Sequence, residues 1–142
     1  MSDDDPFDLR RFIEAQAPVI EAAMAELAAG RKRTHWMWFV FPQIEGLGSS
    51  PMAMRYAIRS AAEARAFLAH EILGERLRAC TRLVLAAKRP LAGVFGAPDD
   101  LKFKSSMTLF AEAAPQETLF AEAIARCCGG ARDAATSSRL AQ

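Results

Sequence analysis

Apolar residues recur along most of the chain at the three- and four-residue spacing that is typical of one face of a helix. The clearest stripe consists of Leu73, Leu77, Cys80, Val84 and Ala87. It stops at Lys88-Arg89-Pro90, where cations complement the negative end of a helix dipole and proline cannot continue the helix. The pattern therefore predicts an amphipathic helix that ends near Ala87.

Start and stop signals divide the rest of the chain into further helices. Residues that favour a helix start stand at Asp5-Pro6, Pro18, Ser50-Pro51, Ser60-Ala-Ala-Glu63, Pro98-Asp99-Asp100, Pro115 and Asp133. Glycines at Gly30, between Gly93 and Gly96, and at Gly129-Gly130 mark helix ends or breaks. We predict an all-α fold, a single compact domain over residues 1–142 with about seven or eight short helices and frayed ends at 1–5 and 141–142.

Six consecutive apolar residues, Trp36 to Phe41, stand between His35 and Gln43. Such a run fits a buried strand or a short helix. Helices are predicted on both sides, and a lone strand would leave its backbone amides without partners in the core. We therefore predict a buried helix that Pro42 ends, and bulky residues of this kind more often form core than a binding site.

Length and charge exclude several classes of function. The chain has 142 residues, which fits one domain, and its 18 basic and 17 acidic residues leave a net charge of +1. The basic cluster Arg31-Lys32-Arg33 could contact nucleic acid or a nucleotide phosphate, but with a net charge near zero a solvated helix end is the favoured interpretation, and we expect no nucleic-acid partner. No window comes near the roughly 20 apolar residues that a membrane-spanning helix needs. Three cysteines, an odd number, and a start without the layout of a secretory signal predict a cytoplasmic protein.

The sequence offers no pattern for a metal site. His35 and His70 lie 35 residues apart, and the cysteines form no C-x-x-C pair, so we predict that no metal is bound. No motif assigns a cofactor or decides whether the protein is an enzyme.

Four stretches of the sequence carry a resemblance to a known family, and two strings within them, HWMWFVFPQ and SSMTLF, are long and rare in composition. The four stretches read Phe7-Asp8-Leu9-x-Arg11-Phe12, Gly30-Arg-Lys32-x-Thr34-His35-Trp36-Met37-Trp38-Phe39-x-Phe41-Pro42-Gln43, Gly46-Leu47-Gly48-x-Ser50, and Phe95-Gly96…Asp99-Asp100-x-Lys102-x-x-Ser105-Ser106-Met107-Thr108-Leu109-Phe110. In these stretches the chain resembles the bacterial and fungal domain-of-unknown-function family 1810. The resemblance implies an all-helical single domain and brings no established activity. The chain departs from the family at His70-Glu71, where relatives tend to have His-Pro, and at Cys127-Cys128, where an aromatic residue is more usual.

Candidate chemistry gathers on the predicted helix over residues 99–108. If an aspartate caps this helix, Lys102, Ser105 and Ser106 share one side by helical spacing and could converge on an anion. A lysine could also activate a serine hydroxyl as a nucleophile, provided that its ammonium group is desolvated. The alternative is that both serines bond local backbone carbonyls and that Lys102 is solvated.

Other polar residues flank the aromatic run. His35 suits acid–base chemistry or the border between core and surface. The loop Gly46–Ser50 could present free amides to a phosphate or carboxylate, or form an ordinary turn. Asp133 is placed to cap the last helix.

These residues predict a ligand site between segment 35–50 and the 99–108 helix. Its candidate residues are His35, Trp36, Gln43, Lys102, Ser105, Ser106 and Asp133. The expected ligand is a small anionic molecule, such as a nucleotide or another phosphorylated metabolite. The alternative function is a non-catalytic protein-interaction or homodimerisation module.

Overall fold

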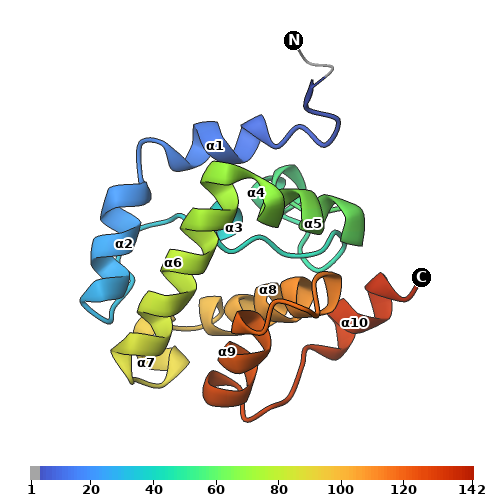
Figure 1. Ribbon diagram of the computed structural model, residues 1–142. Helices are drawn as coiled ribbons and strands as arrows, with labels where there is room; N and C mark the ends of the chain where they lie inside the picture. Colours follow the sequence, from blue (N-terminus) through green and yellow to red (C-terminus); the bar gives the residue numbers. More distant parts are fainter. Residues whose placement is uncertain (1–3) are drawn as a thin grey trace.

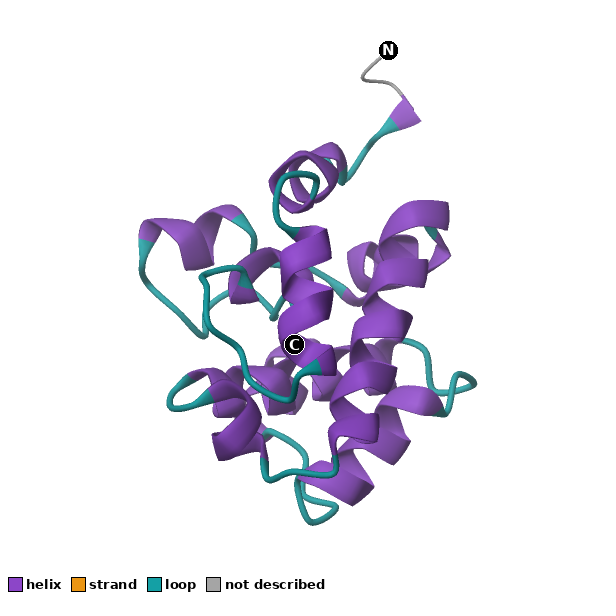
Figure 2. Ribbon diagram, turned by 90° about the vertical axis from the view of Figure 1, so that its left-hand side faces the viewer, coloured by secondary structure: helices purple, strands orange, loops and turns teal. Residues whose placement is uncertain are grey.

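The computed structural model describes residues 4–142, and residues 1–3, part of the predicted frayed end, lie outside this range. The helices in the described part are α1 (Arg10–Gln16), α2 (Ile20–Ala28), α3 (Met37–Val40), α4 (Pro51–Arg55), α5 (Ala61–Ala69), α6 (Glu71–Ala87), α7 (Leu91–Phe95), α8 (Asp99–Ala113), α9 (Leu119–Cys127) and α10 (Ala134–Leu140). Figure 2 shows these helices joined by loops, with no strand in residues 4–142. The predicted all-α, single-domain fold is confirmed. The helices outnumber the expected seven or eight because α3, α4 and α7 are only four or five residues long.

Helix α6 runs through the middle of the molecule and packs against α1, α2, α5 and α9 (Figure 1). Its predicted apolar stripe is confirmed, since the four stripe residues from Leu73 to Val84 are at most 2% exposed. Helix α8 crosses the lower half of the molecule and packs against α5, α7, α9 and α10 (Figure 1). Its inward side chains Phe103, Met107 and Phe110 are fully buried. Helices α6 and α8 thus organise one continuous core.

Several helix starts follow the predicted capping chemistry. The Ser50 hydroxyl accepts a hydrogen bond from the Ala53 amide in α4, and the Ser60 hydroxyl accepts one from the Glu63 amide in α5, each at 3.1 Å. His70 ends α5 and also caps α6, because its Nδ1 accepts hydrogen bonds from the amides of the second and third residues of α6. These bonds satisfy amide donors that have no partner inside the helix.

The aromatic run is helical over a shorter stretch than predicted. Helix α3 is a single turn, with Trp36 and Phe41 as its flanking cap residues. Trp38 is half-buried, and the other five residues of the run are at most 6% exposed. Immediately after the run, Ile44 and Ile58 form an isolated parallel bridge, which holds the following loop against the start of α5. The run is therefore mainly core, as its composition indicates.

The segment after Pro90 is a helical turn that ends at Gly96, so the predicted break lies at Gly96 and does not include Gly93. The amides of Gly93 and Val94 donate to the carbonyl of Pro90, which starts α7. A proline at this point leaves no amide unpaired, since the first amides of a helix have no partner within it. Helix α7 buries Val94 and Phe95, and the Val94 carbonyl accepts a hydrogen bond from the Lys32 amide at 2.6 Å.

In the described residues, no helix is long and apolar enough to cross a membrane.

Candidate functional site

Glu26 of α2 fixes the segment that leads into the aromatic run. Its carboxylate accepts hydrogen bonds from the Arg33 amide at 2.8 Å, the Thr34 amide and hydroxyl at 3.1 and 2.7 Å, and Trp36 Nε1 at 2.9 Å. Burial alone would raise the pKa of Glu26, but the hydrogen bonds from Arg33, Thr34 and Trp36 outweigh it and lower that pKa to about 2. The ionised carboxylate therefore holds the indole of Trp36, which is fully buried.

Three charged side chains meet beside the two tryptophans. Lys32 Nζ lies 2.9 Å from Asp99 Oδ2, and Lys102 Nζ lies 3.4 Å from Asp99 Oδ1. The same ammonium groups lie over indole rings, Lys32 at 5.1 Å from the Trp36 centroid and Lys102 at 5.5 Å from the Trp38 centroid. Two ammonium groups share one carboxylate, so the cluster carries a net positive charge.

A cavity of about 500 Å³ opens beside this cluster, between the loop after α3, helix α4 and the starts of α8 and α10. Its walls are formed by Trp38, Gln43, Leu47, Gly48, Ser49, Ser50, Ala53, Pro98, Leu101, Lys102, Ser105, Asp133 and Ala135. The fold thus brings together four of the seven predicted site residues, namely Gln43, Lys102, Ser105 and Asp133. We call this space the α8–α10 cavity.

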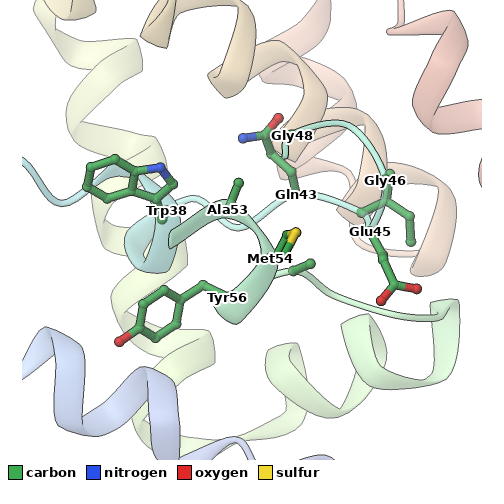
Figure 3. Close-up of a pocket in the computed structure, with 10 residues that line it drawn as sticks. Trp38, Gln43, Glu45, Gly46, Gly48, Ala53, Met54 and Tyr56 are labelled. Carbon is green, nitrogen blue, oxygen red and sulfur yellow. The ribbon is translucent and has the colours of Figure 1, made fainter. Parts of the chain in front are cut away.

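A smaller cavity of about 50 Å³ adjoins it and shares Trp38, Gln43, Gly48 and Ala53 with it. Figure 3 shows Trp38 and Tyr56 toward one side of this smaller cavity and Glu45 and Gly46 toward the other. Gly46 adopts a φ of +98°, and a Cβ there would collide with the guanidinium group of Arg139 in α10. The loop therefore lies directly against the Arg139 side chain of α10, and the positive φ of Gly46 favours glycine at this position.

The other three predicted residues lie apart from the α8–α10 cavity. His35 is exposed and does not line it. Trp36 lies behind the wall, fully buried, with its N–H bonded to Glu26. Ser106 is also fully buried, and its hydroxyl has no hydrogen-bond partner within residues 4–142.

Asp133 keeps one carboxylate oxygen available at the cavity. Its Oδ2 accepts hydrogen bonds from the Thr136 amide at 3.0 Å and the Thr136 hydroxyl at 2.5 Å, which confirms the predicted cap of α10. Its amide donates to Thr108 Oγ1 of α8 at 3.0 Å. Oδ1 accepts no hydrogen bond from any described residue, and Asp133 is one of the residues that line the cavity.

The local geometry does not favour a nucleophile. Ser105 donates its hydroxyl proton to the Leu101 carbonyl at 3.2 Å, while the Lys102 ammonium pairs with Asp99, so the lysine is not held as a base for the serine. Burial raises the pKa of Cys80 to about 12 and also raises the pKa of Cys127 and of Cys128, which keeps these thiols protonated at neutral pH. Among the described residues, no three His, Cys, Asp or Glu side chains gather so that they could hold a metal ion. The arrangement suits binding better than covalent chemistry.

Sequence reasoning missed three contributors to this site. The prediction of a solvated Arg31-Lys32-Arg33 cluster is wrong for Lys32, whose side chain is only 7% exposed and paired with Asp99. Asp99 was expected only as a helix cap, and Trp38 only as core. The available signal for Lys32 was its position four residues before the aromatic run that begins at Trp36. Its carboxylate partner lies 67 positions away, so only the packing of α7 and α8 reveals the pair.

Comparison with known proteins gives a family and a fold without an activity. The family model described as "Protein of unknown function (DUF1810)" matches residues 6–140. Among solved structures, the chain is similar to the conserved hypothetical protein Rv1873 from Mycobacterium tuberculosis, with 55% sequence identity and a TM-score of 0.95. That match covers 97% of this chain and 99% of the other. No curated protein matches the chain.

Proposed function

This chain belongs to the DUF1810 family of proteins of unknown function, and we propose that it binds a small anionic molecule in the α8–α10 cavity. The cavity volume of about 500 Å³ falls within the range of small-molecule sites, roughly 300–1,000 Å³. Its walls combine an indole and several apolar side chains with a few polar groups, as ligand sites commonly do. A nucleotide or another phosphorylated metabolite fits this description.

One observation supports an anionic ligand above all: the shared carboxylate of Asp99. Lys32 occupies one oxygen of this carboxylate at 2.9 Å, which leaves Lys102 only the longer contact of 3.4 Å. The Lys102 side chain is 28% exposed and lines the cavity, whereas that of Lys32 is 7% exposed. The excess positive charge therefore faces the cavity through Lys102, where a phosphate or carboxylate would complete its coordination.

The proposal is tested by removing this charge while keeping the size of the side chain. Binding of inorganic phosphate and of AMP is measured by isothermal titration calorimetry for the wild type, Lys102→Met and Lys104→Met. Lys104 lies on the same helix outside the cavity wall, so its variant is a matched control for the loss of one cation. We expect Lys102→Met to weaken binding by roughly tenfold to a hundredfold and Lys104→Met to leave it unchanged. Equal effects of the two substitutions, or no binding of either probe to the wild type, would contradict the proposal.

A second candidate is a homodimer contact at the rim of the cavity. Leu101 and Met54 are large apolar side chains that are 64% and 61% exposed, and each lines one of the two adjoining cavities. Contiguous exposed apolar surface is typical of protein contacts, and Leu101 and Met54 would contribute to such a surface if they lie together. Sedimentation velocity at increasing protein concentration tests this candidate. A dimer that Leu101→Ser dissociates would favour it, and a monomer at all concentrations would oppose it.

The predicted cytoplasmic location also stays a proposal. Its support is the presence of three cysteines, Cys80, Cys127 and Cys128, that are all free thiols in the structure. Fractionation of the native host, followed by detection of the protein in each compartment, would test it.

A further inference from the structure

We infer that the ligand of the α8–α10 cavity carries two unlike groups, a phosphate or carboxylate that binds Lys102 and an amino group that donates to Asp133. The class that combines these groups with a flat ring is the aminated nucleotide. This inference rests on the proposed function and specifies the ligand of that same site.

The two charged groups stand at separate points along α8. Lys102 lies on the first turn of that helix, and Asp133 is tied to it through Thr108, whose hydroxyl accepts the Asp133 amide at 3.0 Å. Thr108 follows Lys102 by six residues, which corresponds to about 9 Å of rise along the helix. This rise refers to the backbone of α8, and the cavity is lined by both the Lys102 cation and the Asp133 carboxylate. Such a pair of opposite charges matches a ligand with opposite polarity at its two ends.

Asp133 has no counter-charge among the residues that the structure describes. Its neighbour Arg132 pairs instead with Glu112 at 3.2 Å, and no cation within residues 4–142 lies within ion-pair distance of Asp133. The Thr136 bonds occupy only Oδ2, and a carboxylate accepts several hydrogen bonds. A purely anionic ligand would be repelled at this end, whereas an amino group would supply the missing donor.

The wall between these ends suits a ring. Trp38 is half-buried, and Leu47, Leu101 and Pro98 extend the apolar surface beside it. Gln43 adds a carboxamide, which can both donate to and accept from the edge of a heterocycle. An aromatic body carrying both polar groups would therefore contact the whole cavity, whereas a bare phosphate would contact only the Lys102 end.

The experiment compares AMP with purine riboside 5′-monophosphate, which lacks only the 6-amino group. Affinities are measured by calorimetry for the wild type, Asp133→Asn and Lys102→Met. Asparagine caps helices as well as aspartate does, so Asp133→Asn keeps the start of α10 and removes the charge. Asp100→Asn is the charge control, because Asp100 lies at the start of α8 but does not line the cavity.

We expect AMP to bind the wild type at least roughly tenfold more tightly than its deamino analogue, because the 6-amino group adds one charge-assisted hydrogen bond to Asp133. Asp133→Asn should remove this preference and leave the affinity for the analogue unchanged, whereas Lys102→Met should weaken both ligands equally. Thermal melts show whether each variant is folded. If Asp133→Asn is not folded, Asp133→Ser takes its place, because serine also caps helices.

Two results separate the inference from the proposed function. If the analogue binds the wild type as tightly as AMP, or if Asp133→Asn leaves the preference for AMP intact, the inference is overturned. The proposed function survives that result as long as Lys102→Met still weakens binding. If neither nucleotide binds the wild type, the inference is overturned, and the proposed function fails with it when inorganic phosphate does not bind either.

Discussion

Replacing Glu26 with glutamine should remove much of the pH dependence of folding stability in mild acid. The folded-state pKa of Glu26 is about 2, against an ordinary value of 4.5. A carboxylate with a lowered pKa stabilises the fold fully above pH 4.5, and this contribution is lost as the pH falls toward 2. Wild-type stability should therefore decline between pH 4.5 and pH 2, and the decline should be smaller in Glu26→Gln.

The contribution of Glu26 to folding stability can be worked out from the hydrogen bonds that its carboxylate accepts. Its carboxylate is partly exposed, so solvent screens part of the gain from the Arg33 and Thr34 donors. The Trp36 N–H is different, because its ring is fully buried and Glu26 is its acceptor. Leaving such a donor without a partner costs about 1–3 kcal/mol, which is the loss we expect for Glu26→Ala at neutral pH.

The assay is urea denaturation followed by tryptophan fluorescence at several values between pH 7 and pH 2.5. Asp5 contributes in the same direction: burial would raise its pKa, but hydrogen bonds from the Arg10 and Leu9 amides lower it, so some decline should persist in Glu26→Gln. Glu122→Gln is the control, since Glu122 is half-exposed and paired only with Arg126 one turn away. If Glu26→Gln declines between pH 4.5 and pH 2 as steeply as the wild type, the role assigned to this carboxylate is refuted.

Four further predictions concern the core and the site. Phe41→Ala should destabilise the protein by about 3–5 kcal/mol in urea denaturation, and the half-buried Trp38 should cost less when replaced by alanine. Lys102→Met should leave the melting temperature unchanged or raise it, because Asp99 keeps its pair with Lys32; a clear drop would indicate a structural role. Ser106→Ala should melt at the same or a higher temperature, since its buried hydroxyl has no partner among the described residues. Gly46→Ala should lower the melting temperature, because alanine is strained at the positive φ of this position, whereas the guanidinium group of Arg139 can move aside; an unchanged melt would show that the loop adopts another backbone conformation.

The sequence by itself determined the helices and most of their ends. The stripe of α6 and the caps at Ser50, Ser60 and Asp133 were predictable because each depends on residues within about four positions of one another. Single turns such as α7 were missed, since their stability comes from packing and not from a repeated pattern. Four of the residues that the sequence nominated for a site, Gln43, Lys102, Ser105 and Asp133, line one cavity, and the sequence singled them out because polar side chains stand there beside obligate core residues.

Only the tertiary structure decided which of these polar groups meet, and with what charge. Lys32 reaches Asp99 because its amide bonds to Val94 in α7, and Asp133 reaches the cavity because its amide bonds to Thr108 in α8. The two tryptophans of the aromatic run differ in their surroundings: Trp36 is fully buried, whereas Trp38 lines the cavity. These outcomes depend on contacts between segments distant along the chain, which packing sets and local spacing does not encode.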